Sequence, residues 1–413
     1  MFKIRSIAFY LPQFHAIPEN DKAWGKGFTE WTNVKKAIPL FKGHYQPHVP
    51  HESVGYYDLN DPAVMVRQVA MAKEYGISGF CFYHYWFNGK KLLETPVNNF
   101  LKLANKIDFP FCLCWANENW TRRWDGLDNE IIIEQSHSKE DDLAFILDKI
   151  PFFNDERYIK IDNKPILLVY RTELLPNAKK TADIWRTAMR EHGIGEIYLI
   201  RVESFLSNFN PIDINFDASV EFAPDRWNNG TQLFPESNGT NNPPYMSDYL
   251  DTVLKTLTKK MPNYKLYRSA FPNWDNTARR GFAGSGFLNN DPKVFELYLQ
   301  QIVNYTLKNM NIAEQFIFIN AWNEWGEGCH LEPDKKNEFK YLEICKKIFQ
   351  NGESDNSDEI LLYLYSIQNQ MKTDLAIVKN ELNRITNSLP FKFKSFFLKP
   401  IFWILHFFKS HIK

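Results

Sequence analysis

The 413-residue sequence lacks several features that would place it in a common class of protein. Lys plus Arg and Asp plus Glu each number 49, so the formal net charge is zero. The chain therefore lacks the excess of positive charge that would indicate a nucleic-acid partner. Its five cysteines form no CxxC pair and no spacing typical of zinc ligands, so we predict no metal site. Cys112 and Cys114 alternate within an apolar run and are expected to be reduced core residues. Residues 1–14 contain charges and an early proline but no long apolar stretch, so we expect no secretory signal and a cytoplasmic catalytic part.

The most informative stretch of the chain is residues 316–332. It begins with a run of Phe and Ile that predicts a buried strand, and it then changes abruptly to Trp, Asn, Gly and carboxylates. Glu324 and Glu327 lie three residues apart, close enough to serve one pocket. Paired carboxylates are the usual machinery for glycosidic bonds, and Trp322 and Trp325 supply flat apolar faces for sugars. The alternative interpretation is a strand end followed by a solvated turn.

Short apolar runs alternate with amphipathic segments along most of the chain, which predicts a parallel (β/α)8 TIM barrel. The eight expected strands are residues 4–10, 77–85, 109–115, 165–170, 196–202, 216–222, 264–271 and 315–320. Helices are expected at residues 61–75, 95–106, 139–149, 179–192, 247–260, 292–308 and 337–349. A long polar loop should follow the first strand, up to about residue 60.

Polar and aromatic side chains recur where these strands end, which is where barrel enzymes place their sites. Each such residue alone is more often structural than functional, and the repetition is the signal. The predicted substrate-binding residues are Tyr10, His15, Tyr83, His84, Trp86, Trp115, Asn117, Glu118, Arg122, Asp125, Glu221, Trp274, Asp275, Trp322 and Asn323. Glu324 and Glu327 are the predicted catalytic pair.

Four motifs closely resemble those of the WbsX-like family, whose members are named as glycosyltransferases of bacterial O-antigen and capsule loci. The motifs are Ala8–His15, Trp24–Trp31, Trp115–Gly126 and Asn320–Gly328. The resemblance covers about residues 4–350, and that family in turn looks like glycoside hydrolase family 99, the (β/α)8 endo-α-mannosidases.

The resemblance to family 99 implies roles for three residues. Glu324 would act as base on the sugar 2-hydroxyl and give an anhydro-sugar intermediate. Glu327 would be the acid/base on the glycosidic oxygen, and Tyr10 would line the sugar site. The implied stereochemical outcome is retention.

The sequence leaves the reaction open between transfer and hydrolysis. We find no convincing Asp-x-Asp metal site, and residues 281–286 are not a dinucleotide fingerprint, so we predict no cofactor. Arg279 and Arg280 would suit a phosphate or a carboxylate, although a solvated arginine pair is the more common arrangement. The first hypothesis is a glycosyltransferase of surface-polysaccharide biosynthesis that acts on an oligosaccharide or lipid-linked glycan, with a nucleotide sugar as a candidate donor. The alternatives are an endo-glycosidase that trims such glycans and a membrane-tethered glycan-binding scaffold.

The character of the chain changes after residue 350. Residues 351–359 read as an acidic linker, and apolar residues at three- and four-residue steps over 360–389 predict a coiled coil and a homo-oligomer. A helix packed back on the barrel is the alternative. Residues 390–413 combine five lysines and no acid with many aromatics, and their apolar run is too short to span a bilayer. We therefore predict a peripheral anchor at the inner face of the cytoplasmic membrane, with a terminal helix that completes the core as the alternative.

Overall fold

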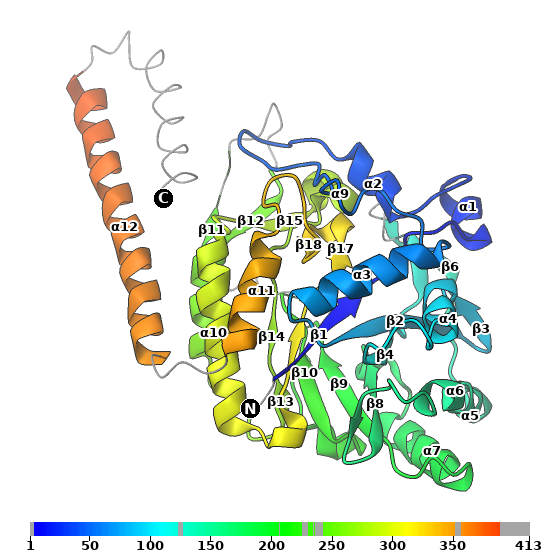
Figure 1. Ribbon diagram of the computed structural model, residues 1–413. Helices are drawn as coiled ribbons and strands as arrows, with labels where there is room; N and C mark the ends of the chain where they lie inside the picture. The colour runs from blue at the N-terminus through cyan, green and yellow to red at the C-terminus, as the bar shows by residue number, and fades with distance from the viewer. Residues whose placement is uncertain are drawn as a thin grey trace.

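The computed structural model describes residues 4–122, 127–205, 207–224, 230–233, 235, 243–351 and 357–388. At its centre, parallel strands form a barrel that is surrounded by helices (Figure 1). In order of hydrogen-bonded neighbours, the strands are β13 (Leu266–Tyr267), β10 (Ala218–Glu221), β9 (Tyr198–Glu203), β8 (Lys164–Val169), β4 (Phe111–Trp115), β2 (Gly79–Phe87), β1 (Arg5–Tyr10), β16 (Phe316–Ile319) and β14 (Ser269–Ala270).

The two ends of this strand order meet in one strand position. Only Arg268 separates β13 from β14 along the chain, and β13 pairs with β10 while β14 pairs with β16. The nine strands therefore occupy eight positions, and each position overlaps one of the eight strands expected from the sequence. The prediction of a (β/α)8 barrel is confirmed.

The helices around the barrel agree with the predicted ones to within a few residues. They are α3 (Pro62–Glu74), α4 (Thr95–Lys102), α5 (Lys139–Leu147) with α6 (Ile150–Phe153), α7 (Ala178–Glu191), α8 (Tyr249–Thr258), α10 (Pro292–Asn309) and α11 (Lys340–Asn351). The expected long loop after β1 contains two short helices, α1 (Pro18–Trp24) and α2 (Glu30–Lys36). Each has only seven residues, too short to give a clear helical period in the sequence.

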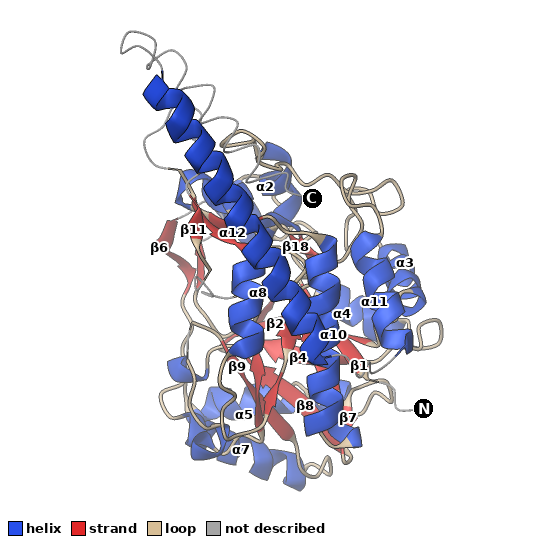
Figure 2. Cartoon of the chain, turned by 90° about the vertical axis from the view of Figure 1, so that its left-hand side faces the viewer, coloured by secondary structure: helices blue, strands red, loops and turns tan. Residues whose placement is uncertain are grey.

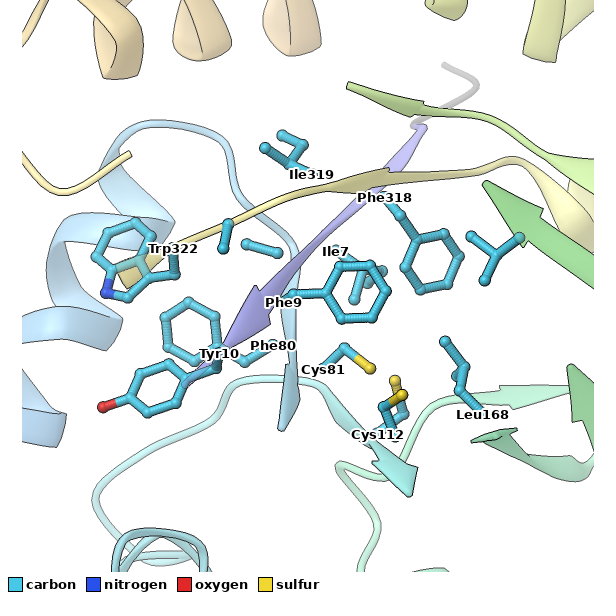
Figure 3. Packing of buried hydrophobic residues seen from close by; sticks show 14 of the residues in the cluster. Ile7, Phe9, Tyr10, Phe80, Cys81, Cys112, Leu168, Phe318, Ile319 and Trp322 are labelled. Atoms are coloured by element: carbon cyan, nitrogen blue, oxygen red, sulfur yellow. The ribbon is translucent and has the colours of Figure 1, made fainter. Parts of the chain in front are cut away.

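The barrel strands are buried on both faces, as expected for a parallel sheet covered by helices. Side chains alternate across β1, so Phe9 points into the barrel while Tyr10 points toward the helix layer. Phe9 packs against Phe318, and Tyr10 lies in a cluster with Phe80 and Trp322 (Figure 3). Cys112 and Cys114 are buried and form no disulfide, as predicted.

Small sheets elaborate the carboxyl ends of the barrel strands. β5 (Trp120–Arg122) pairs with β6 (Leu127–Ile133), and β12 (Tyr245–Asp248) pairs with β11 (Gln232–Leu233) and β15 (Ser285–Leu288). β17 (Asn323–Glu324) pairs with β18 (Cys329–His330) directly after β16. β3 (Lys90–Leu92) and β7 (Lys160–Ile161) extend neighbouring barrel strands.

The chain continues into one long helix, α12 (Ser357–Ser388), which begins slightly before the predicted boundary at residue 360. Its first turns pack on α8 and α10, where Leu364 is fully buried and Gln368 donates to Asp251 Oδ1 at 2.9 Å. The remainder extends away from the barrel (Figures 1 and 2). The first half of α12 therefore packs on the barrel, as in the alternative interpretation of the sequence. Self-association through the second half of α12 stays a prediction.

The predicted membrane-interface segment at residues 390–413 lies outside the described residues. Among the helices that the structure describes, none combines the length and the apolar character needed to cross a membrane.

Candidate active site

A cleft of about 460 Å³ opens at the carboxyl ends of the barrel strands. Residues at or just beyond all eight strand positions line it, which is the usual location of a site in this fold. From β1 to β16 around the barrel, they include Leu11, Tyr83, Ala116, Tyr170, Phe205, Phe222, Trp274 and Glu324. Further lining comes from α9 (Thr277–Arg280) and β15.

Glu324 and Glu327 reach the cleft from a tight turn that follows β16. β17 and β18 are antiparallel, and the 3₁₀ helix η6 (Trp325–Glu327) joins them. Gly328 ends η6 with a φ of +57°, a conformation that favours glycine, and a Cβ there would lie 3.1 Å from His48. Backbone pairing and close packing therefore hold the turn, with both carboxylates at the cleft.

Arg279 binds both of these glutamates at once. Its Nη2 donates to Glu324 Oε2 at 2.7 Å, and its Nη1 donates to Glu327 Oε1 at 2.5 Å. Its Nε donates to a third carboxylate, Glu30 Oε1, at 2.7 Å. The Arg279 side chain is only 7% exposed, so the solvated arrangement that is common for an arginine pair does not hold for this residue.

Glu30 comes from α2, in the segment that the sequence suggested would be a loop. Thr29 caps the start of this helix, and the Glu30 side chain is fully buried. Gly326 in η6 makes room for it, because a Cβ at that position would lie 1.6 Å from Glu30 Oε1. The lack of a side chain at Gly326 thus lets a third carboxylate reach the same guanidinium.

Burial and charge set the protonation of this group. Burial raises the pKa of Glu324 above its usual value of 4.5; Arg279 opposes that rise, while the negative charge of Glu30 adds to it. The pKa of Arg279 is well above its ordinary value because three carboxylates surround it. Burial, with Glu324 nearby, also raises the pKa of Tyr83 and Tyr85 well above the ordinary tyrosine value. Both hydroxyls therefore keep their protons and can donate hydrogen bonds to a ligand.

Aromatic rings form much of the remaining wall. Tyr170 meets Phe222 edge-on at 5.1 Å between ring centroids, and Trp120 meets Tyr85 edge-on at 5.0 Å. With Trp274 they present flat apolar surface beside the carboxylates. Such surface suits the C–H faces of sugar rings. The sequence predicted this role for Trp322 and Trp325, but both rings are buried and do not line the cleft.

Glu118, another predicted site residue, lies at the cleft in a polar corner of its own. Its Oε1 accepts from Arg171 Nη1 at 2.7 Å. Asn117 is buried and binds the backbone of Arg171 in both directions, accepting from its N–H and donating to its carbonyl, each at 2.8 Å. Asn117 is therefore a residue that positions Arg171 and Glu118, and it does not line the cleft.

Three predicted site residues lie in the hydrophobic core. The Tyr10 hydroxyl donates to Gln68 Oε1 on α3 at 2.7 Å, so the sugar-lining role implied for it is wrong. The cause is strand alternation, because Phe9 occupies the inward direction at the end of β1. Trp322 Nε1 donates to buried Glu332 at 3.1 Å, and Trp115 stacks on Phe145 with ring centroids 4.2 Å apart.

Three more predicted residues lie outside the cleft, and two of them bind partners there. His84 Nε2 accepts from the buried Lys149 ammonium at 2.6 Å, and burial lowers the pKa of Lys149 to about 8. Trp86 Nε1 donates to Asp141 on α5 at 2.8 Å. His15 is buried with 2% of its surface exposed and does not line the cleft.

Buried acids and amides near the strand ends make supporting contacts. Glu221 binds Arg268 at 2.8 Å and Lys259 at 2.6 Å beneath the cleft, and these cations hold its pKa below the ordinary value. Asn323 makes two hydrogen bonds to the backbone of Leu11 at 2.8 and 3.0 Å.

Asp275 buttresses the turn that carries the paired glutamates. Its N–H donates to the carbonyl of Glu327 at 2.6 Å, while its carboxylate binds His44 Nε2 at 2.6 Å. Two other predictions are not tested by the structure, since Asp125 and the side chain of Arg122 lie outside the described residues.

The predicted site residues did not include Tyr85 and Tyr170, which line the cleft, or Glu30, which is fully buried and binds Arg279. The sequence gave Arg279 only as one candidate anion binder. A signal existed for each. Glu30 lies within the Trp24–Trp31 motif, Tyr85 and Tyr170 end strands, and Arg279 belongs to an arginine doublet. Nothing local in the sequence shows that these elements meet.

Comparisons with known proteins agree with this architecture. The family model described as Glycosyltransferase WbsX matches residues 6–345. Two strains of Xanthomonas campestris pv. campestris each have a protein described as uncharacterized protein WxcX that is 44% identical over 344 residues. That match covers 83% of this chain and 49% of the relative, so the chain spans about half the length of the curated relatives it matches.

Solved structures with the same fold include glycoside hydrolases. A glycoside hydrolase-like protein superposes with a TM-score of 0.54 at 14% identity, covering 84% of this chain and 94% of the other. The GH99 endo-α-mannosidase of Bacteroides thetaiotaomicron gives 0.52 at 15% identity, covering 84% of this chain and 96% of the enzyme. At such identities the likeness shows the fold. The family match over residues 6–345 and the 44% identical relatives show more: the chain belongs to the WbsX glycosyltransferase family.

Proposed function

We propose that this chain is a carbohydrate-active enzyme that acts on glycosidic bonds during assembly of a bacterial surface polysaccharide. One observation carries the proposal. Glu324 and Glu327 share the guanidinium of Arg279 beside a cleft that all eight strand positions line. A carboxyl pair next to aromatic walls at the carboxyl end of a barrel suits glycosidic chemistry.

The two carboxyls differ in a way that suits two roles. Glu324 is 7% exposed, and its raised pKa makes its carboxylate a stronger base than a solvated one, as base attack through a sugar hydroxyl needs. The Glu327 side chain is more open at 19% exposed, so it has access to a leaving oxygen and then to an incoming acceptor. With both carboxyls on one guanidinium, we propose a retaining reaction in which Glu324 is the base and Glu327 the acid/base.

The acceptor decides between transfer and hydrolysis. A sugar hydroxyl gives a longer glycan, and water gives a shorter one, while the chemistry at Glu324 and Glu327 is the same. The family favours transfer, and the fold shared with GH99 enzymes favours hydrolysis as the second candidate. Arg280 also lines the cleft and is a candidate contact for a phosphate on a nucleotide sugar or on a lipid-linked glycan.

The C-terminal region suggests where the enzyme works. We propose that residues 390–413 bind the inner face of the cytoplasmic membrane and that the exposed half of α12 mediates self-association. Expression of residues 1–350 tests both parts. The shortened protein should stay in the supernatant and elute as a monomer, and membrane pelleting without the tail would contradict the anchor.

The decisive experiment compares wild type with Glu324→Gln and Glu327→Gln on lipid-linked oligosaccharide from the source organism, with and without nucleotide sugars. Glu343→Gln is the matched control, because Glu343 is exposed on α11 away from the cleft. Products are identified by mass spectrometry. A longer glycan that appears only with a nucleotide sugar and intact Glu324 and Glu327 would support the transferase.

Two other outcomes would change the proposal. A shortened glycan without nucleotide sugar would make the protein a hydrolase. Identical products from all four proteins would remove the glutamates from the chemistry and favour a glycan-binding scaffold.

A further inference from the structure

Behind the turn that carries the paired glutamates, three buried side chains converge on one point. His48, from the loop between α2 and α3, places Nδ1 2.9 Å from Nε2 of His330. Asp334 Oδ2 lies 3.9 Å from each of these nitrogens. All three residues are at most 6% exposed. Within the described part of the chain, this is the group of His, Cys and carboxylate donors with the spacing of a metal site.

The geometry points to a divalent cation held by His48, His330 and Asp334, and we propose zinc. Tetrahedral zinc with ligands at about 2.0–2.1 Å separates neighbouring donor atoms by roughly 3.3 Å. The observed separations of 2.9, 3.9 and 3.9 Å bracket that value, so side-chain shifts of about half an ångström would complete the ligand triangle. Two imidazoles and one carboxylate are a common set for a zinc site that leaves its fourth position to water.

Contacts around two of the three donors, His330 and Asp334, already orient them as ligands. His330 Nδ1 lies 2.8 Å from the carbonyl of Glu332, and because a carbonyl only accepts, this nitrogen carries the proton and Nε2 carries the lone pair. The other oxygen of Asp334 accepts from the backbone N–H of Lys336 at 2.9 Å and of Asn337 at 2.5 Å, which directs Oδ2 toward the histidines. A metal-binding histidine commonly donates its second ring N–H to a carbonyl in this way.

The two chain segments that supply the donors are joined by backbone hydrogen bonds. His51 N–H donates to the carbonyl of Pro333 at 2.9 Å, and Lys335 N–H donates to that of Val49 at 2.9 Å. The donors are therefore brought together by the fold itself. Without a metal, the His48–His330 contact is a single hydrogen bond between neutral rings, which leaves Asp334 Oδ2 beyond hydrogen-bond distance of both.

The sequence did not suggest this site because 282 positions separate the two histidines. Its consequence for the enzyme is structural. The His330 ring stacks on Trp325 with centroids 3.7 Å apart, and Trp325 lies in η6 between the two cleft glutamates. A metal on His330 would therefore fix the turn from behind without entering the cleft.

Lys336 provides a variant with the opposite expected effect. Its ammonium lies over the Tyr45 ring at 4.4 Å and is within electrostatic reach of Asp334 and His48. Its positive charge should weaken cation binding, so Lys336→Gln should bind zinc more tightly than wild type. A purely structural histidine pair would show no such response.

The test measures zinc directly and needs no assay of activity, so it can fail independently of the proposed function. Full-length protein is stripped with a chelator, titrated with ZnCl2 by calorimetry, desalted and analysed for metal content. His48→Gln removes a donor, and His51→Gln is the matched control, because His51 lies on the same loop with Nδ1 on Ser53 Oγ. Melting curves with ZnCl2 and with MgCl2 are recorded for each protein that circular dichroism shows to be folded.

We expect one zinc per chain and a melting temperature raised by several degrees in wild type and His51→Gln. His48→Gln should lose at least tenfold in affinity, and MgCl2 should have no effect because magnesium prefers oxygen ligands. The proposal is overturned if folded wild type takes up no more zinc than His48→Gln, or if His51→Gln loses the metal equally. Unaltered affinity in Lys336→Gln would also contradict it.

Discussion

Three glutamates follow strand β16 within a few residues of one another, and they end in two different environments. Glu324 and Glu327 face the cleft and share the guanidinium of Arg279. Glu332 is sealed beneath the turn, where it accepts from Tyr57, Gln68, Trp322 and Trp325 at 2.7–3.1 Å. Burial raises the pKa of Glu332 to about 7 in spite of these four donors.

The comparison shows two environments for a carboxyl near the end of β16, one at the cleft and one sealed in the core. The cleft pair shares one cation, Arg279, and lines the cleft, so a ligand could reach it. Glu332 is saturated by neutral donors that come from different segments, so its oxygens hold those segments together. Both kinds of carboxyl occur in the same seventeen-residue stretch 316–332, so the sequence alone does not tell them apart.

The largest expected effect is the loss of turnover when one glutamate of the cleft pair, Glu327, is replaced by glutamine. Glu327→Gln should lower turnover by roughly 10²–10⁴-fold, because an amide cannot transfer a proton to the glycosidic oxygen. Its melting temperature should stay close to that of wild type, since the glutamine oxygen still accepts from Arg279. Turnover on the assay substrate and thermal unfolding are measured on the same preparations. If Glu327→Gln lost much stability but kept ordinary turnover, Glu327 would have a structural role like the one we assign to Glu332.

Arg279→Gln should come next, and it should damage both activity and stability. Removal of the cation leaves Glu30, Glu324 and Glu327 close together without their counter-charge, and breaking a buried ion pair costs roughly 3–5 kcal/mol. Chemical denaturation gives the free energy of unfolding. Arg171→Gln is the control, because Arg171 pairs with Glu118 and Glu173 on the other side of the cleft. Equal losses of activity and of unfolding free energy in both variants would mean that Arg279 is no more important to the cleft than Arg171.

Glu332→Gln should give the opposite result from Glu327→Gln, with a smaller magnitude. One amide oxygen cannot accept from all four donors, and each unsatisfied buried donor costs roughly 1–3 kcal/mol. We expect a lower denaturant midpoint and turnover within a few-fold of wild type. A variant with full stability and no turnover would place Glu332 in the chemistry.

The sequence predicted the barrel well because the strands are continuous apolar runs whose identity needs only local information. The cleft opens at the end of the barrel where the sequence placed the site. It failed where neighbours in sequence point in opposite directions, as Phe9 and Tyr10 do, since the signal from a strand end does not say which side chain faces inward. It failed again where long-range contacts build the site, because Glu30 and Arg279 are 249 positions apart.

The smallest expected effect concerns the pH dependence that Glu30 imposes on Glu324. As a base, Glu324 works ionised, so activity should fall as the pH drops through its raised pKa, above the ordinary 4.5. The same raised pKa means that ionisation costs folded-state free energy, so this group's contribution to stability decreases as the pH rises through that range. Glu30→Gln removes a negative neighbour and leaves Arg279 to fewer carboxylates, and both changes favour ionised Glu324. The acidic limb of the pH–rate profile should therefore move to lower pH in Glu30→Gln and stay in place in Glu343→Gln, whereas a limb that moves upward would show that Glu30 does not repel Glu324.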